Sequence, residues 1–192
     1  MCKQKIVFIG ASTGGPAHIE KILEALKEPL EYTLIIAQHM GSEFLPSFVR
    51  RLSLKTKHNI MLCEDQQVIT HGNVYIATNQ CSIHGDDNNL KFHVLNSAIT
   101  HFNPDINHLF TSAATLNTTY DMLAILLTGI GDDGVKGCKL LAEHGATCIA
   151  ESEESAIVYG IPARAKEQVQ NINILNLDQI IDAIKTFGSS NV

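Results

Sequence analysis

Basic residues are scarce relative to acidic ones in this sequence. Its 14 lysines and arginines are outnumbered by 20 aspartates and glutamates, which gives a formal net charge of −6 at pH 7. Nucleic-acid-binding domains normally carry a basic surface, so this balance argues against a nucleic-acid partner.

Cysteine pairs and long apolar runs are also missing. The five cysteines are odd in number and widely spaced, and no two form C-x-x-C, so they predict reduced thiols of a cytosolic protein rather than disulfides or a zinc site. No apolar segment approaches the ~20 residues that a membrane span needs, and the run after MCKQK is too short for a signal peptide. We therefore expect a cytoplasmic protein without membrane insertion.

Short apolar runs alternate with segments of helical period along most of the 192 residues. Such alternation predicts an α/β fold with a doubly wound, mostly parallel sheet and helices on both faces. Strands are expected over 5–10, 32–38, 121–129 and 146–151. Helices are expected over 16–28, 44–54, 106–119, 135–145 and 177–187, and Asn103-Pro104-Asp105 is interpreted as the start and cap of the third of them rather than as part of a site.

The middle of the chain departs from this alternation. Four short strand-like runs are joined there by turns, and GDDNN at 85–89 is a strong hairpin signal, so we expect an antiparallel hairpin excursion. The sequence has no repeat, low-complexity stretch or linker, and residues 1–192 are expected to form a single domain. The four runs are 59–63, 73–78, 80–85 and 90–95.

A glycine-rich turn, IGASTGGP at 9–16, separates the first strand from the first helix. Its glycines have P-loop spacing, but Pro16 occupies the lysine position, and the dinucleotide pattern G-x-G-x-x-G fails at Ser12. The turn does match G-x-S-x-G, in which a serine on a tight strand-to-helix turn is exposed as a nucleophile. A helix N-cap serine and a weak anion site at the helix start are the alternatives.

Two further groups follow strands at equivalent places. His39 comes directly after the strand 32–38, and Asp132 and Asp133 follow the strand 121–129. Ligands of open α/β sheets bind at the carboxyl ends of the strands, so these side chains are expected to share one edge with Ser12. A nucleophilic serine needs a base and an orienting acid. The pattern predicts a serine hydrolase built from Ser12, His39 and one of the two aspartates, in a chain order that differs from that of α/β-hydrolases.

Motifs spread over roughly residues 6–184 closely resemble the catalytic domain of bacterial chemotaxis-receptor protein-glutamate methylesterases. They are IGASTGGP, AQHM, F-x-x-x-F-x-x-RL, NPDINHLFTSAA, LLTGIGDDGVKG and YGIPARA. The resemblance implies that Ser12 is the nucleophile, His39 the base and Asp133, directly before the glycine, the third member of the triad. Departures from the family pattern at HMGSEF, IATNQ and Ile130 concern the rim of the site and not its chemistry.

The activity implied by the resemblance is hydrolysis of γ-glutamyl methyl esters on methylated cytoplasmic helices of chemoreceptors. Deamidation of receptor glutamines by the same acyl chemistry is also implied, and no metal or cofactor is needed. Backbone N–H groups of Thr13, Ile130 or Gly131 are the expected oxyanion donors. Arg50 and Arg51 are interpreted either as a solvated helix face or as contacts to a carboxylate-rich receptor helix.

Most members of that family carry an N-terminal phosphorylatable receiver domain. Here the nucleophile turn begins at residue 9, so no receiver domain is expected. The histidines other than His39 lack metal-ligand spacing, and we expect no metal site. The alternative function is a non-enzymatic phosphate- or nucleotide-binding module that uses the Gly14–Gly15 turn.

Overall fold

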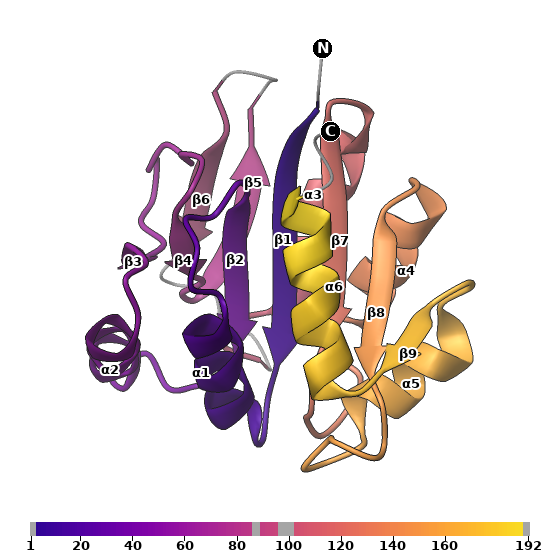
Figure 1. The fold of residues 1–192 in the computed structure, drawn as a ribbon. Helices are drawn as coiled ribbons and strands as arrows, with labels where there is room; N and C mark the ends of the chain where they lie inside the picture. The colour runs from indigo at the N-terminus through magenta and orange to yellow at the C-terminus, as the bar shows by residue number, and fades with distance from the viewer. Residues whose placement is uncertain (1–2, 86–88, 96–101, 190–192) are drawn as a thin grey trace.

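The protein is built on a seven-stranded, wholly parallel sheet, shown in Figure 1. The computed structural model describes residues 3–85, 89–95 and 102–189. Its strands are, in chain order, β1 (Gln4–Ala11), β2 (Thr33–Gln38), β3 (Ile60–Leu62), β4 (Val74–Ile76), β5 (Gln80–His84), β6 (Lys91–Leu95), β7 (Tyr120–Leu126), β8 (Thr147–Glu151) and β9 (Asn173–Leu175). Its helices are α1 (Gly15–Ala25), α2 (Leu45–Lys55), α3 (Ile106–Ala113), the 3₁₀ helix η1 (Ala114–Thr118), α4 (Val135–Glu143), α5 (Ile161–Gln168) and α6 (Leu177–Ser189).

The order of the strands places the first strand at the centre of the sheet. The order is β3-β4-β2-β1-β7-β8-β9, so β2, β3 and β4 lie on one side of β1, with β4 between β2 and β3, and the chain then continues on the other side with β7. In Figure 1 the arrowheads of β1, β2 and β7 point to the same edge. Open α/β sheets bind ligands outside the carboxyl ends of the strands where the order reverses, which here is at β1.

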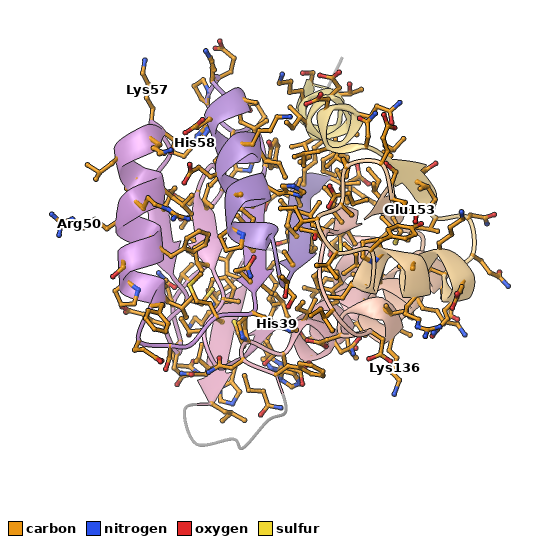
Figure 2. All side chains as sticks on the ribbon, turned by 90° about the horizontal axis from the view of Figure 1, so that it is seen from below. His39, Arg50, Lys57, His58, Lys136 and Glu153 are labelled. Carbon is orange, nitrogen blue, oxygen red and sulfur yellow. The ribbon has the colours of Figure 1, made fainter. Side chains whose placement is uncertain are left out.

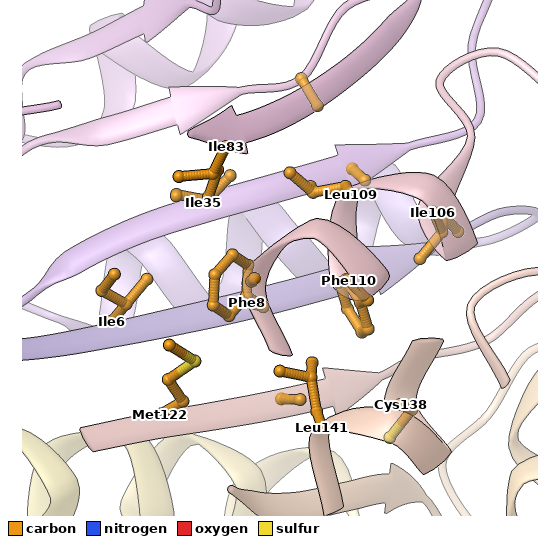
Figure 3. Packing of buried hydrophobic residues seen from close by; sticks show 14 of the residues in the cluster. Ile6, Phe8, Ile35, Ile83, Ile106, Leu109, Phe110, Met122, Cys138 and Leu141 are labelled. Atoms are coloured by element: carbon orange, nitrogen blue, oxygen red, sulfur yellow. The ribbon is translucent and has the colours of Figure 1, made fainter. Parts of the chain in front are cut away.

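Side chains of β1 alternate between two buried layers. Ile6 and Phe8 pack in the layer that includes α3, α4, α5 and the β5–β6 hairpin, whereas Val7 and Ile9 pack against α1, α2 and α6. Figure 3 shows the first layer, in which the rings of Phe8 and Phe110 meet edge to face with centroids 5.7 Å apart. Helices thus cover both faces of the sheet, as predicted.

The middle of the chain contributes to two sheets. β5 and β6 pair antiparallel, with Ser82 opposite His93, which confirms the predicted hairpin; residues 86–88 of its expected turn lie outside the described residues. β3 and β4 instead pair in parallel and extend the main sheet beyond β2.

Three further features differ from the sequence prediction. The helix expected over 106–119 is α-helical only to Ala113 and continues as η1. The elements α5 and β9 have no counterpart in the prediction. α5 has only eight residues, three of them buried, and β9 has three half-buried or exposed residues, so neither has enough apolar residues to show a period.

A buried lysine joins the two ends of the described chain. Lys5 of β1 is 4% exposed, and its Nζ donates to the carbonyl oxygens of Phe187 at 2.6 Å and Gly188 at 3.2 Å. These carbonyls belong to the last turn of α6, where the helix dipole favours a cation. None of the described helices has the length and apolar character to cross a membrane.

Candidate active site

The glycine-rich turn at 9–16 requires Gly14 and Gly15 for different reasons. Gly14 has φ of +87°, a left-handed conformation that favours glycine. A Cβ at Gly15 would lie 2.0 Å from Gln38 Oε1 and 2.7 Å from Ala11 Cβ, so only hydrogen fits there. The chain can therefore pass from β1 into α1 within three residues, and Ser12 is left half-buried at the carboxyl end of the central strand.

His39 lies beside Ser12 because β1 and β2 are paired in register. Ala11 is opposite Gln38, and the His39 N–H donates to the Ala11 carbonyl at 2.9 Å. The buried Gln38 side chain links Ser12 to His39. Its Nε2 donates to the Ser12 carbonyl at 2.9 Å and to the His39 carbonyl at 3.0 Å. Ser12 Oγ itself forms no hydrogen bond with any described residue. Nucleophile–base bonds are often loose in a free enzyme, so the lack of a Ser12 Oγ–His39 hydrogen bond is compatible with catalysis.

Asp133, and not Asp132, is the aspartate that contacts His39. Asp133 is 1% exposed, and its Oδ2 accepts from His39 Nε2 at 2.7 Å, whereas Asp132 is exposed. The backbone N–H groups of Ile106 and Asn107 also donate to the Asp133 carboxylate, at 2.9 and 3.0 Å. These donors form the start of α3, whose dipole favours an anion, so the buried charge is compensated by three hydrogen bonds.

The contacts of His39 fix both its tautomer and its ring plane. A carboxylate only accepts hydrogen bonds, so His39 Nε2 carries a proton; when the imidazole is neutral, the lone pair is therefore on Nδ1. The ring of Phe102 stacks on the imidazole, with centroids 5.0 Å apart and planes 5° from parallel. The result is an oriented imidazole whose Nδ1 is not used by Asp133.

Backbone N–H groups without a partner among the described residues lie beside Ser12, both in its own turn and in the loop after β7. A Cβ at Gly129 would lie 2.6 Å from Ser12 Cβ, so this loop passes in direct contact with the serine. The N–H groups of Thr13, Ile130 and Gly131 donate no hydrogen bond within the described part of the chain. Free N–H groups of this kind are what an oxyanion needs.

The two arginines singled out from the sequence lie on α2, away from this centre. Arg51 Nε is 3.1 Å from Glu20 Oε2 of α1, and its guanidinium also lies over the ring of Phe48. Arg50 is exposed, and in Figure 2, seen from below Figure 1, it points outward from α2 while His39 lies nearer the middle of the view. Neither side chain takes part in the contacts around Ser12.

The segment before α3 has two roles, of which the sequence indicated one. Asp105 caps α3, as expected, because its Oδ1 accepts from the His108 N–H at 2.8 Å. The segment also reaches the site, since the Asn103 carbonyl accepts from the Met40 N–H at 3.0 Å and Phe102 covers His39. No local pattern could signal these contacts, because their partners lie more than sixty residues apart in the sequence.

The described residues contain no group of three or more histidine, cysteine, aspartate or glutamate side chains that could hold a metal ion. The contacts around Ser12 are instead those of hydrogen-bonding and acid–base groups.

Residues 7–184 match the family model described as CheB methylesterase. The chain belongs to the CheB methylesterase family. It is 34% identical over 177 residues to a protein-glutamate methylesterase/protein-glutamine glutaminase 1 of Saccharophagus degradans, and 37% identical over 162 residues to a protein-glutamate methylesterase/protein-glutamine glutaminase of Colwellia psychrerythraea. These matches cover 92% and 82% of this chain but 48% and 42% of the relatives, so the chain spans about half the length of the curated relatives it matches.

The CheB methylesterase fold is also found in a solved structure. The crystal structure of the Thermotoga maritima CheB methylesterase catalytic domain matches with a TM-score of 0.86 at 28% identity, over 95% of this chain and 98% of that one. This match confirms the predicted fold class, and the family match confirms the resemblance seen in the motifs.

Proposed function

We propose that this chain is a serine hydrolase that removes methyl esters from glutamate side chains of chemoreceptors. The observation that carries the proposal is the 2.7 Å contact between His39 Nε2 and Asp133 Oδ2, beside Ser12 at the carboxyl ends of adjacent strands. The names of the relatives, protein-glutamate methylesterase/protein-glutamine glutaminase, support this substrate. The proposed partners are the methylated cytoplasmic helices of those receptors.

The first half of the proposed reaction forms an acyl-enzyme. His39 Nδ1 takes the proton of Ser12 Oγ while Oγ attacks the ester carbonyl carbon, and Asp133 stabilises the resulting imidazolium. Free N–H groups of Thr13, Ile130 or Gly131 stabilise the oxyanion. The tetrahedral species then collapses, its bond to the methoxy oxygen breaks, and His39 gives its proton to the departing methanol.

The second half regenerates the enzyme. Water attacks the acyl carbon while His39 Nδ1 takes one of its protons, the bond to Ser12 Oγ breaks, and the proton returns to Oγ. The product is a glutamate side chain. A glutamine side chain follows the same path with ammonia as the leaving group, which is the proposed deamidation.

The test is methanol release from methylated receptor membranes, comparing the wild type with Ser12→Ala. We expect Ser12→Ala to abolish turnover with the fold intact, because Ser12 lies in a turn outside the hydrophobic core. Residual turnover within about tenfold of the wild type would contradict the proposal, because removing a triad nucleophile costs far more than that.

Arg50 and Arg51 enter the proposal only as peripheral receptor contacts. Charge reversal of both should raise KM for receptor membranes and leave the rate on a small soluble methyl ester unchanged, because both lie on α2. Raised salt should reproduce the effect in the wild type, since exposed charges are screened. An unchanged KM for the double variant would assign both arginines to plain surface.

The phosphate-binding alternative has little support in the turn itself. The Gly15 N–H donates to the Ser12 carbonyl at 2.9 Å, and Pro16 has no N–H. The start of α1 therefore offers fewer free donors than a phosphate cradle uses.

A further inference from the structure

Thr128 is a fully buried residue, two positions after the end of β7, whose polar groups are all hydrogen-bonded. Its carbonyl accepts from the Ser12 N–H at 3.0 Å, and its hydroxyl donates to the Thr13 carbonyl at 2.8 Å. The same hydroxyl accepts from the Val158 N–H at 2.9 Å, and the Thr128 N–H donates to Glu151 Oε2 at 2.9 Å. One residue thus joins the nucleophile turn, the loop after β8 and a buried carboxylate.

The two contacts with the nucleophile turn lie on either side of the Ser12 side chain. The Ser12 N–H precedes the Ser12 Cα, and the Thr13 carbonyl follows it, with the free Thr13 N–H between them. We propose that Thr128 is the positioning residue of the nucleophile: it sets the direction of Ser12 Oγ and of the Thr13 N–H without touching substrate. This inference rests on the proposed function of Ser12 and assigns a role to a residue outside the triad.

The Thr128 hydroxyl must act as donor and acceptor at once. It donates to the Thr13 carbonyl and accepts from the Val158 N–H, so the turn and the loop after β8 are fixed to each other through a single oxygen. The loop after β8 also covers the turn, because Ile157 Cβ lies 2.8 Å from where a Cβ of Gly14 would be. Serine can replace this oxygen, whereas valine has the shape of threonine without it.

A buried carboxylate supports Thr128 from behind. Glu151 is wholly buried, and besides the Thr128 N–H it accepts from Ser155 Oγ at 2.8 Å and lies 3.2 Å from His18 Nδ1. His18 belongs to α1, the helix that begins at the nucleophile turn. Glu151 therefore fixes Thr128 and the first turn of α1 to the same end of β8, and the turn between them cannot shift independently.

The experiment compares Thr128→Val with Thr128→Ser. We expect Thr128→Val to lower kcat about 10- to 100-fold with KM within about twofold, because a small misplacement of a reacting group can cost ~10²-fold. Labelling of Ser12 by a fluorophosphonate should slow in parallel, and Thr128→Ser should restore both rates to within about threefold of the wild type. Hydrogen exchange of the Val158 amide should speed up in Thr128→Val only, because this N–H donates to the Thr128 hydroxyl.

The matched control is Thr33→Val. Thr33 is a buried threonine at the amino end of β2, and its hydroxyl bonds the Thr70 carbonyl at 3.5 Å, away from the site. The Thr33→Val variant should leave kcat unchanged. If Thr128→Val does not fold, Thr128→Ala removes the same hydroxyl with a smaller side chain.

Two results would overturn the inference: a folded Thr128→Val protein with wild-type kcat and labelling rate, or Thr128→Ser as impaired as Thr128→Val. The exchange and labelling measurements do not require a receptor substrate. If the wild type is labelled at Ser12 by the fluorophosphonate but releases no methanol, the proposed function is refuted. The exchange and labelling measurements then still decide whether Thr128 positions Ser12.

Discussion

At the scale of single residues, the orientation of His39 depends on two side chains that come from distant parts of the sequence. Asp133, 94 positions later, fixes the direction of Nε2, and Phe102 fixes the ring plane. The spacing of the motifs predicted that an aspartate of the pair after β7 would share an edge with His39, but not which one. Burial against the start of α3 decides between Asp132 and Asp133, and burial is a tertiary property that neighbouring residues do not reveal.

Asp133→Asn should lower kcat by about 10⁴-fold, because an amide holds the imidazole in the wrong tautomer. Asp132→Asn is the matched control: it makes the same chemical change one residue away, at an exposed side chain, and should stay close to wild type. Steady-state hydrolysis of a methyl ester measures both. If Asp132→Asn is the more damaged variant, the proposed acid is assigned one residue too far along the chain.

At the scale of elements, α3 holds Asp133 in place through the N–H groups of its first turn. The N–H groups of Ile106 and Asn107 hold Asp133, and the same turn is capped by Asp105. The sequence predicted the start of this helix and its cap, because N-capping is a local signal. The sequence did not predict α5 or β9, because these short elements are held by tertiary contacts and not by a local pattern. One such contact is the bond from the Ile161 N–H at the start of α5 to the Gly129 carbonyl at 2.8 Å.

Asp105→Ala should lower the free energy of unfolding by about 1 kcal/mol, the usual cost of losing an N-cap, and should also lower kcat. Activity falls because the donors that hold Asp133 move with the frayed turn. Urea unfolding and steady-state kinetics on the same preparations separate the two effects.

The control for this prediction is Asn176→Ala. Asn176 accepts from the Gln179 N–H at 3.0 Å at the start of α6, and Gln179 Oε1 accepts from the Asn176 N–H at 2.9 Å. Asn176→Ala should lower the free energy of unfolding by about as much as Asp105→Ala does, and it should leave kcat unchanged. An equal fall of kcat in both variants would mean that general destabilisation, and not the support of Asp133, explains the result.

At the scale of the whole molecule, stability and the site depend on the same central strands. β1, β2 and β7 are buried on both faces and deliver Ser12, His39 and the loop with Asp133. Their continuous apolar runs made the parallel sheet predictable. The parallel pairing of β3 and β4 was not predictable, because three-residue strands carry no signal of direction.

Phe110→Ala should lower the free energy of unfolding by about 3–5 kcal/mol, because it empties a fully buried ring site against Phe8 in the layer of Figure 3. Leu54→Ala removes an apolar side chain that is 80% exposed and should stay within ~0.5 kcal/mol of wild type. Urea unfolding followed by circular dichroism measures both. A loss below 1 kcal/mol at Phe110 would mean that the layer repacks freely.

The bond between Lys5 and the end of α6 has a consequence for the way the protein is made. On the ribosome β1 is synthesised before both of its neighbours in the sheet; β7 begins only at Tyr120, and the carbonyls that accept from Lys5 come at Phe187 and Gly188. The nascent polypeptide therefore carries an apolar strand with one unpaired edge until β7 has been made. Unpaired strand edges are where growing chains aggregate, so we expect the nascent chain to be most prone to aggregation before β7 has been made.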